Sequence, residues 1–176
     1  MIGQSYGGYG VYSLITQTDR FKAAAALAGP SNLISEYGQF EALERYDRDA
    51  EVDFTNMTLL ESGVSDTGPN SASGHLGTPP WRDLDLYIRN SPLFHVEQCH
   101  TPILIIQGDM DFVPIQQGEE FFRAMQRLGR RSRFVRYWGE GHFISSPANQ
   151  VDSMKQLFKW FDEFLMKPEK TEGSKQ

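Results

Sequence analysis

Three short, glycine-rich stretches of this chain carry a serine, an aspartate and a histidine, in that order. They are Gly3-Gln4-Ser5-Tyr6-Gly7-Gly8, Gly108-Asp109-Met110-Asp111 and Gly139-Glu140-Gly141-His142. A serine hydroxyl is a weak nucleophile until a base takes its proton, and a histidine held by a carboxylate is such a base. The three residues therefore predict acyl transfer, with attack by Ser5, proton transfer by His142 and orientation of the imidazole by Asp111.

The serine lies in the pattern Gly-x-Ser-x-Gly, where a strand stub at Met1 and Ile2 is predicted to turn into a helix. Such a turn strains the serine backbone and projects its side chain from the helix N-terminus. The backbone N–H of Tyr6 could then donate to an oxyanion. The pentapeptide alone leaves another interpretation open, a glycine-rich turn that only packs well or cradles a phosphate. The sequence has no phosphate loop of the Gly-x-x-x-x-Gly-Lys-Ser/Thr kind.

The aspartate and the histidine each lie in a predicted loop after a strand. Asp111 follows the apolar run 103–107, which predicts a strand buried on both faces. Asp109 competes with Asp111 for the orienting role, and either carboxylate could instead shape the turn or cap the helix expected from Ile115. Of the four histidines, only His142 lies in a glycine-rich loop between a strand and a terminal helix, which makes it the candidate base.

The elements that must position these residues alternate between strands and helices. We expect strands over 21–28, 103–107 and 133–138, the last at a sheet edge, and helices over 6–18, 33–46, 80–88, 115–128 (with Gly129 as C-cap) and 149–166. Residues 31–90 are predicted to be a cap-like or inserted region with a loop over 61–80, and the charged tail 167–176 to be disordered. The pattern predicts an α/β fold with a mostly parallel sheet flanked by helices. Serine, aspartate and histidine in this order indicate the α/β-hydrolase fold, since other serine hydrolase folds use other orders.

The composition excludes several classes of protein. The 176 residues suffice for one ordinary domain, and 39% hydrophobic with 23% charged residues is typical of a globular chain. The net charge of −6 argues against a nucleic-acid partner, and no apolar run approaches the roughly 18 to 20 residues that cross a bilayer. We therefore expect no nucleic acid and no membrane as partner. The single cysteine, Cys99, cannot form an internal disulfide, and neither it nor the N-terminus, which carries no secretory signal, assigns a compartment.

Metal ligation has little support in the sequence. The chain has no His-x-x-x-His pair and no pair of cysteines, and the nine acidic residues between positions 36 and 66 lack an ordered ligand spacing. We interpret those acids as a solvated face, with a negative rim for a basic substrate terminus as the alternative. We expect no metal site.

Six segments of the chain, taken together, resemble those of a known protein family. They are Gly3 to Tyr9, Asp19 to Ala24, Ser91 to Phe94, Thr101 to Gly108, Val113-Pro114 and Gly139 to His142. Together they resemble the catalytic domain of the prolyl oligopeptidase family of serine peptidases, most of all its bacterial members related to acylaminoacyl peptidase and the dipeptidyl peptidases. The resemblance runs from residue 3 to about 165 and is weakest over 40–80. It implies the C-terminal part of an α/β-hydrolase domain, with residues 1–166 as a partial catalytic domain that begins at the nucleophile turn.

The resemblance implies a role for each matched residue. Ser5 matches the nucleophile, His142 the general base, Asp111 the acid of the triad, and Tyr6 the residue whose backbone N–H helps to form the oxyanion hole. Members of the family cleave short peptides or acylated N-termini through an acyl-enzyme and need no metal or organic cofactor. The expected function is therefore a serine-type peptidase acting on peptide or acyl-peptide substrates, with a carboxylesterase of the same fold as the alternative.

The chain also departs from the family. It would lack the β-propeller, the first strands of the sheet and the segment that supplies the second oxyanion donor, whose loss costs about 10²- to 10³-fold in rate. A parallel sheet without those strands would leave the strand over 21–28 with an open, apolar edge, through which we expect self-association. A catalytically incomplete fragment that needs its N-terminal half or a partner is the further alternative.

Overall fold

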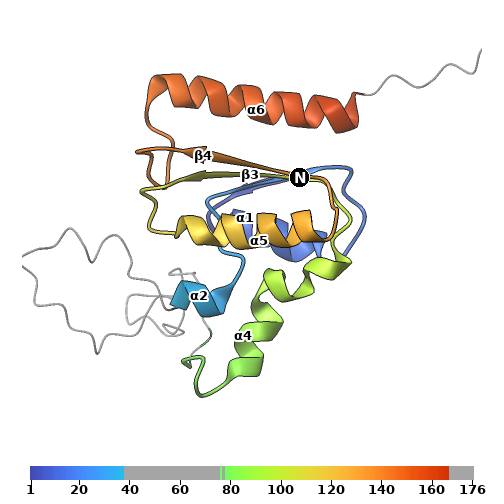
Figure 1. Cartoon of the computed structure of the whole chain (residues 1–176), viewed down its shortest axis with the longest axis vertical. Helices are drawn as coiled ribbons and strands as arrows, with labels where there is room; N and C mark the ends of the chain where they lie inside the picture. Colours follow the sequence, from blue (N-terminus) through green and yellow to red (C-terminus); the bar gives the residue numbers. More distant parts are fainter. Residues whose placement is uncertain (38–75, 77, 167–176) are drawn as a thin grey trace, which may run out of the picture.

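Figure 1 shows a computed structural model of the chain, in which helices lie on both faces of a parallel sheet. The structure describes residues 1–37, 76 and 78–166. The strands, in spatial order, are β1 (Ile2–Gln4), β2 (Ala24–Leu27), β3 (Ile103–Gly108) and β4 (Ser132–Tyr137). Helices α1 (Tyr6–Ile15) and α5 (Ile115–Arg127) lie on one face, and α6 (Pro147–Leu165) lies on the other (Figure 1). The predicted alternation of strands and helices is confirmed.

Three short helical elements lie between β2 and β3 in the described residues. They are α2 (Leu33–Tyr37), α4 (Leu84–Asn90) and the 3-10 helix η1 (Pro92–Gln98). The helix predicted over 80–88 begins only at Leu84, because the side chain of Asp83 caps it by accepting from the N–H of Leu86 at 2.9 Å. Most of the predicted helix 33–46, most of the predicted loop 61–80 and the tail 167–176 lie outside the described residues.

The C-terminal ends of the helices that begin at Tyr6 and at Ile115 each have a distinct local feature. The helix predicted to reach residue 18 ends at Ile15, and the hydroxyl of Thr16 just after it donates to the carbonyls of Tyr12 and Ser13 in the last turn. Helix α5 ends as predicted, with Gly129 at a φ of 65° after its last turn. A left-handed glycine at this position is a common C-cap.

The prediction of an open edge on the strand over 21–28 was wrong. Strand β2 lies between β1 and β3, and Ile2 of β1 pairs with Ala25 of β2 in a parallel register. The free edge on that side of the described sheet belongs to β1, which has only three residues. At the other side β4 pairs only with β3, so the prediction of an edge strand over 133–138 is confirmed within the described sheet.

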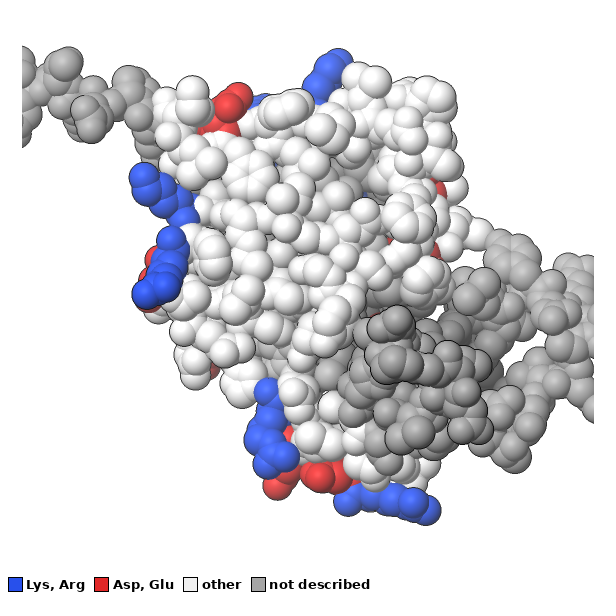
Figure 2. Space-filling view, turned by 180° about the vertical axis from the view of Figure 1, so that it is seen from behind, with Lys and Arg blue, Asp and Glu red and all other residues white. Residues whose placement is uncertain are grey.

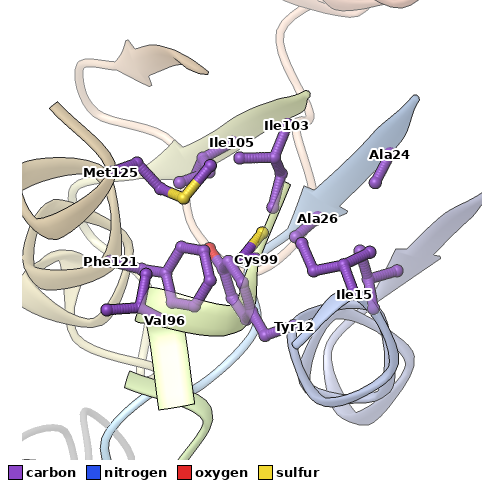
Figure 3. Packing of buried hydrophobic residues seen from close by; sticks show 11 residues of the cluster. Tyr12, Ile15, Ala24, Ala26, Val96, Cys99, Ile103, Ile105, Phe121 and Met125 are labelled. Atoms are coloured by element: carbon purple, nitrogen blue, oxygen red, sulfur yellow. The ribbon is translucent and has the colours of Figure 1, made fainter. Parts of the chain in front are cut away.

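The core between the sheet and helices α1 and α5 holds both helices in place. Figure 3 shows Tyr12 of α1 next to Phe121 of α5, and their ring centroids are 4.4 Å apart. Both side chains are fully buried. The buried residues of this cluster are Val11, Tyr12, Ile15, Ala24, Ala26, Val96, Cys99, Ile103, Ile105, Phe121 and Met125. Because α1 follows Ser5 and α5 follows the Asp111 loop, this packing fixes two of the three segments that carry predicted site residues.

Only part of the apolar face of α6 packs against the sheet. Leu157 and Trp160 are buried, and the indole N–H of Trp160 donates to the carbonyl of Ala24 at 3.0 Å. The other flank is exposed, with Phe158 62% and Val151 55% accessible. This flank consists of Val151, Met154, Phe158 and Leu165. No described helix, α6 included, is long and apolar enough to cross a bilayer.

Candidate active site

The three predicted site residues lie just beyond the carboxyl ends of the strands. Ser5 follows β1, Asp111 follows β3 and His142 follows β4, and all four described strands are parallel. The carboxyl ends of parallel strands are where open α/β sheets bind their ligands. Gln4 joins the serine turn to the histidine loop, because its side-chain N–H donates to the carbonyl oxygen of His142 at 2.9 Å.

Ser5 has the strained backbone that its motif predicts. Its φ is 58° and its ψ is −125°, a region that residues with a Cβ rarely adopt. Two backbone bonds hold it there, from its N–H to the carbonyl of Leu27 at 2.9 Å and from the N–H of Tyr9 to its own carbonyl at 3.0 Å. Glycine is required before the turn, because a Cβ on Gly3 would lie 2.2 Å from the carbonyl oxygen of Gly7.

Replacing Ser5 by glycine is expected to stabilise the fold. A residue held in such a region costs about 1–3 kcal/mol, and glycine removes that strain while it loses more conformational freedom on folding. We expect S5G to raise the free energy of unfolding by about 1 kcal/mol relative to S5A. Urea unfolding of the two variants measures the difference. Equal stabilities would mean that the turn stores no strain at this position.

Tyr6 begins helix α1 directly after the serine. The first N–H groups of an α-helix have no acceptor within the helix, and they lie at the positive end of its dipole. The N–H of Tyr6 is therefore suited to bind a negatively charged oxygen next to Ser5. The side chain of Tyr6 is 58% exposed, and its ring stacks on that of Tyr9 at 5.5 Å between centroids.

Asp111 is the carboxylate that contacts His142. Its Oδ1 lies 2.8 Å from His142 Nδ1 and accepts from the N–H of Val113 at 2.9 Å. The side chain of Asp111 is 0% exposed and that of His142 is 11% exposed. Because a carboxylate only accepts, Nδ1 carries the proton and Nε2 is the basic nitrogen. Within the described residues Ser5 Oγ makes no hydrogen bond to His142, so the structure joins two of the three side chains directly and brings the third to the same end of the sheet.

Asp109, the alternative carboxylate, has other partners. Its Oδ1 accepts from the N–H of Gly139 at 2.6 Å, and its Oδ2 lies 3.3 Å from a guanidinium nitrogen of Arg136. These contacts join the loop after β3 to the end of β4. Asp109 therefore ties the two loops together, whereas Asp111 contacts the imidazole.

Two aromatic rings that the sequence analysis did not single out flank the imidazole. The ring of Phe112 lies 4.2 Å from that of His142 at an angle of 32°, and the ring of Phe143 lies 5.2 Å away and edge-on at 81°. Both residues are sequence neighbours of predicted site residues, and that adjacency was the available signal. They limit the rotation of the imidazole, and Phe143, at 70% exposed, also presents an apolar surface beside it.

Glu140 is a second functional candidate that the sequence analysis missed. It is 1% exposed, and its carboxylate accepts hydrogen bonds from the following turn. The donors are the N–H of Ser145 at 2.7 Å, the hydroxyl of Ser145 at 3.1 Å, the N–H of Ser146 at 3.2 Å and the side-chain amide of Asn149 at 2.6 Å. The hydrogen bonds from Ser146, Ser145 and Asn149 lower the pKa of the Glu140 carboxyl to about 2. Glu140 is therefore ionised at any pH near neutrality.

The lowered pKa of Glu140 predicts a stability contribution that depends on pH. Because the folded state favours the ionised form, this contribution is complete above the ordinary pKa of 4.5 and is lost as the pH falls toward about 2. We expect the difference in unfolding free energy between the wild type and E140Q to be constant above about pH 5 and to shrink below it. Urea unfolding at about pH 6 and about pH 3 tests this. A difference that does not shrink at the lower pH would contradict it.

The described residues contain no group of three or more histidine, cysteine, aspartate and glutamate side chains that could hold a metal ion. The described side chains and backbone N–H groups at this end of the sheet can themselves take part in chemistry. They comprise a strained serine at a helix start, an imidazole whose Nε2 makes no hydrogen bond to the described residues, and a buried carboxylate behind it.

Known proteins resemble the chain in sequence. A sequence model of the prolyl oligopeptidase family matches residues 50–168. The chain is 29% identical over 167 residues to the uncharacterized peptidase YuxL of Bacillus subtilis, covering 93% of this chain and 22% of that protein. It is 30% identical over 172 residues to dipeptidyl-peptidase 5 of Porphyromonas gingivalis, covering 94% and 21%.

Solved structures share the fold. Acylaminoacyl peptidase of Pyrococcus horikoshii superposes with a TM-score of 0.70 at 23% identity, covering 97% of this chain and 24% of that chain. A puromycin-hydrolyzing peptidase of Mycobacterium tuberculosis superposes with a TM-score of 0.69 at 25% identity, covering 93% and 21%. The predicted α/β-hydrolase fold is confirmed. The chain spans about a fifth to a quarter of the length of the proteins it matches.

Proposed function

Because the chain belongs to the prolyl oligopeptidase family, we propose that it carries the catalytic triad of a serine peptidase, with Ser5 as nucleophile, His142 as general base and Asp111 as the acid that orients the base. The observation that supports this most is the 2.8 Å contact between Asp111 Oδ1 and His142 Nδ1. This contact leaves Nε2 as the basic nitrogen of His142. The loop that carries His142 is also contacted directly by Gln4, the neighbour of Ser5.

The proposed reaction is acyl transfer in two steps. His142 Nε2 takes the hydroxyl proton of Ser5 while Oγ attacks the carbonyl carbon of the substrate. The negative charge on the carbonyl oxygen is stabilised by the N–H of Tyr6 and the positive end of α1. The C–N bond then breaks as the imidazolium gives its proton to the leaving amine, and an acyl-enzyme remains. Water, deprotonated by His142, hydrolyses the acyl-enzyme and restores Ser5.

The substrates that we propose are short peptides or N-acylated peptides. Support comes from the relatives, which include dipeptidyl-peptidase 5 of Porphyromonas gingivalis and an acylamino-acid-releasing enzyme of Arabidopsis thaliana, 25% identical over 166 residues. Dipeptidyl, acyl-aminoacyl and simple ester substrates, compared side by side, test this. Hydrolysis of the ester with both peptide substrates intact would favour a carboxylesterase, because the acyl-transfer groups serve either substrate.

The test of the proposed triad is covalent labelling with a fluorophosphonate, which reacts with activated serines. We expect mass spectrometry of the labelled chain to find the phosphonyl group on Ser5, and heat-unfolded chain, the matched control, to remain unlabelled. A folded chain that labels elsewhere would reject Ser5 as the nucleophile. If the folded chain does not label, it does not form the site alone, and the same test is repeated on a longer protein that contains it.

We also propose that the isolated chain self-associates through the free edge of β1. Backbone groups of alternate residues on an edge strand are unpaired and can bind another strand. Ile2 on this edge is 56% exposed, and Leu14 of the neighbouring helix α1 is 42% exposed. Figure 2 shows this side of the molecule, where charged side chains lie at the margin and the centre is uncharged.

A lysine on the edge strand is expected to prevent this association. Ile2→Lys places a charge on the edge, which disfavours pairing with a second copy. We expect sedimentation velocity to find oligomers in the wild type and a monomer in I2K. Leu128→Lys, which changes an apolar residue 38% exposed at the far end of α5, is the control and should behave as the wild type. A monomeric wild type would contradict the proposal.

A further inference from the structure

The loops that carry Asp111 and His142 are joined at the backbone of Glu140. The N–H of Met110, next to Asp111, donates to the carbonyl oxygen of Glu140 at 2.9 Å. Gly108, which ends β3, lies so close that a Cβ there would be 2.2 Å from the same oxygen. The start of the histidine loop is therefore held directly against the aspartate loop.

The side chain of Glu140 holds the other end of the same loop. Its carboxylate accepts from Ser145, Ser146 and Asn149, which lie at the end of the loop and in the first turn of α6. The four residues between Glu140 and Ser145 include His142. The backbone on both sides of the histidine is thus anchored to one residue.

We propose that Glu140 is a positioning residue, which holds His142 against Asp111 by anchoring both ends of the histidine loop. Its expected effect on turnover rests on the proposed function, whereas its effect on the His142–Asp111 contact does not. An imidazole that is displaced by about 1 Å loses its alignment, which can cost about 10²-fold in rate.

The chemistry around Glu140 requires a carboxylate. Among the described residues, the groups that hydrogen-bond to its oxygens are all donors: two backbone N–H groups, one hydroxyl and one amide N–H₂. A glutamine at this position would turn its own N–H₂ toward at least one of these donors, and a hydrogen bond would be lost. The negative charge also lies at the N-terminus of α6, where the helix dipole favours it.

The contact between Glu140 and Asn149 can be reversed by exchanging the carboxylate and the amide between the two positions. In E140Q the negative charge is lost, the N–H₂ at position 140 faces the backbone N–H of Ser146 donor to donor, and Asn149 must turn its own amide to accept from it. In N149D two carboxylates face each other, because Nδ2 of Asn149 and Oε1 of Glu140 are only 2.6 Å apart in the wild type. In the double variant E140Q/N149D, the amide at position 140 donates to the carboxylate at position 149 and its oxygen still accepts from Ser145. We therefore expect each single variant to be impaired and the double variant to be restored in part.

The first readout does not depend on activity. The proton shared between His142 Nδ1 and Asp111 gives a downfield ¹H NMR resonance, which is assigned by its loss in H142Q. We expect this resonance in the wild type, its loss or broadening in E140Q and N149D, and its return in the double variant. The second readout is the steady-state kinetics of the form that labels with fluorophosphonate. There we expect E140Q to lower kcat by about 10²-fold with little change in KM.

The outcomes separate this role from a purely structural one. If E140Q loses unfolding free energy but keeps the resonance and kcat, Glu140 only stabilises the fold and the proposal is wrong. If the double variant recovers no more than the single variants, the contact with Asn149 does not hold the loop. Should E140Q not fold, N149A removes one donor from the carboxylate and is judged by the same resonance. If no form of the protein labels at Ser5, the proposed function fails, and the resonance still decides whether Glu140 positions His142.

Discussion

Replacing Ser5 by alanine should abolish fluorophosphonate labelling and lower kcat of the active form by about 10⁶-fold. The reason is that alanine removes the only oxygen that can form the acyl-enzyme, while binding and oxyanion stabilisation remain. The alanine keeps the Cβ that is held at a φ of 58°, so the turn itself should not change. Activity and labelling are measured on the same preparations, so that loss of the nucleophile can be distinguished from loss of protein.

The control for S5A is a second serine on the same helix. Ser13 of α1 undergoes the same chemical change in S13A but lies two helical turns from the site. We expect S13A to label like the wild type and S5A to unfold at nearly the wild-type urea concentration. Labelling that persists in S5A would mean that another serine is the nucleophile.

The sequence was most informative where burial leaves one solution. The run Ile103 to Ile106 predicted a strand buried on both faces, and all four residues are 0% exposed in β3. The helix over 115–128 and its glycine cap were equally clear, because a left-handed glycine is a common end of a helix and Gly129 has a φ of 65°. The Gly-x-Ser-x-Gly pattern predicted the strained turn at Ser5, since that motif is defined by its backbone.

The sequence was least informative where structure depends on a distant neighbour. Strand β1 reads Ile-Gly-Gln, too short for any periodicity, and its pairing with β2 was therefore missed. The early end of α1 was not predicted either, and neither were the hydrogen bonds from the hydroxyl of Thr16 to two carbonyls of its last turn. The last helix was predicted over 149–166, but what covers each flank of its apolar face depends on the layer around it, and Phe158 is 62% exposed.

In the candidate active site, too, some features could be predicted from the sequence and others could not. Both Asp109 and Asp111 follow β3 in one turn, so residue type could not rank them, and the path of the backbone decides which one contacts His142. In the sequence, Glu140 was named only as one residue of the segment that carries His142, and no role was predicted for it. Its partners include the backbone N–H groups of Ser145 and Ser146, which every residue possesses and which therefore leave no mark in a sequence.

The exchange of Asp111 for asparagine is the second large effect that we expect, a fall of about 10⁴-fold in kcat. Neither orientation of the new amide serves the reaction. If its oxygen faces His142, the imidazolium loses its stabilising charge and the N–H₂ is buried where Oδ2 has no partner among the described residues. If its N–H₂ faces His142, Nδ1 must accept, and the proton moves to Nε2, the nitrogen that must take the proton of Ser5.

Asp109→Asn is the matched control, because it makes the same chemical change two residues away in the same loop. Its oxygen can still accept from the N–H of Gly139, and only the contact with Arg136 is weakened, a partly exposed ion pair at 3.3 Å. Such pairs contribute about 0–1 kcal/mol, so we expect kcat to fall no more than about fivefold. Steady-state kinetics of both variants on one substrate makes the comparison. If Asp109→Asn caused the large loss and Asp111→Asn did not, the carboxylate that acts on His142 in the working enzyme would be Asp109, and the loop would have to rearrange from the conformation seen here.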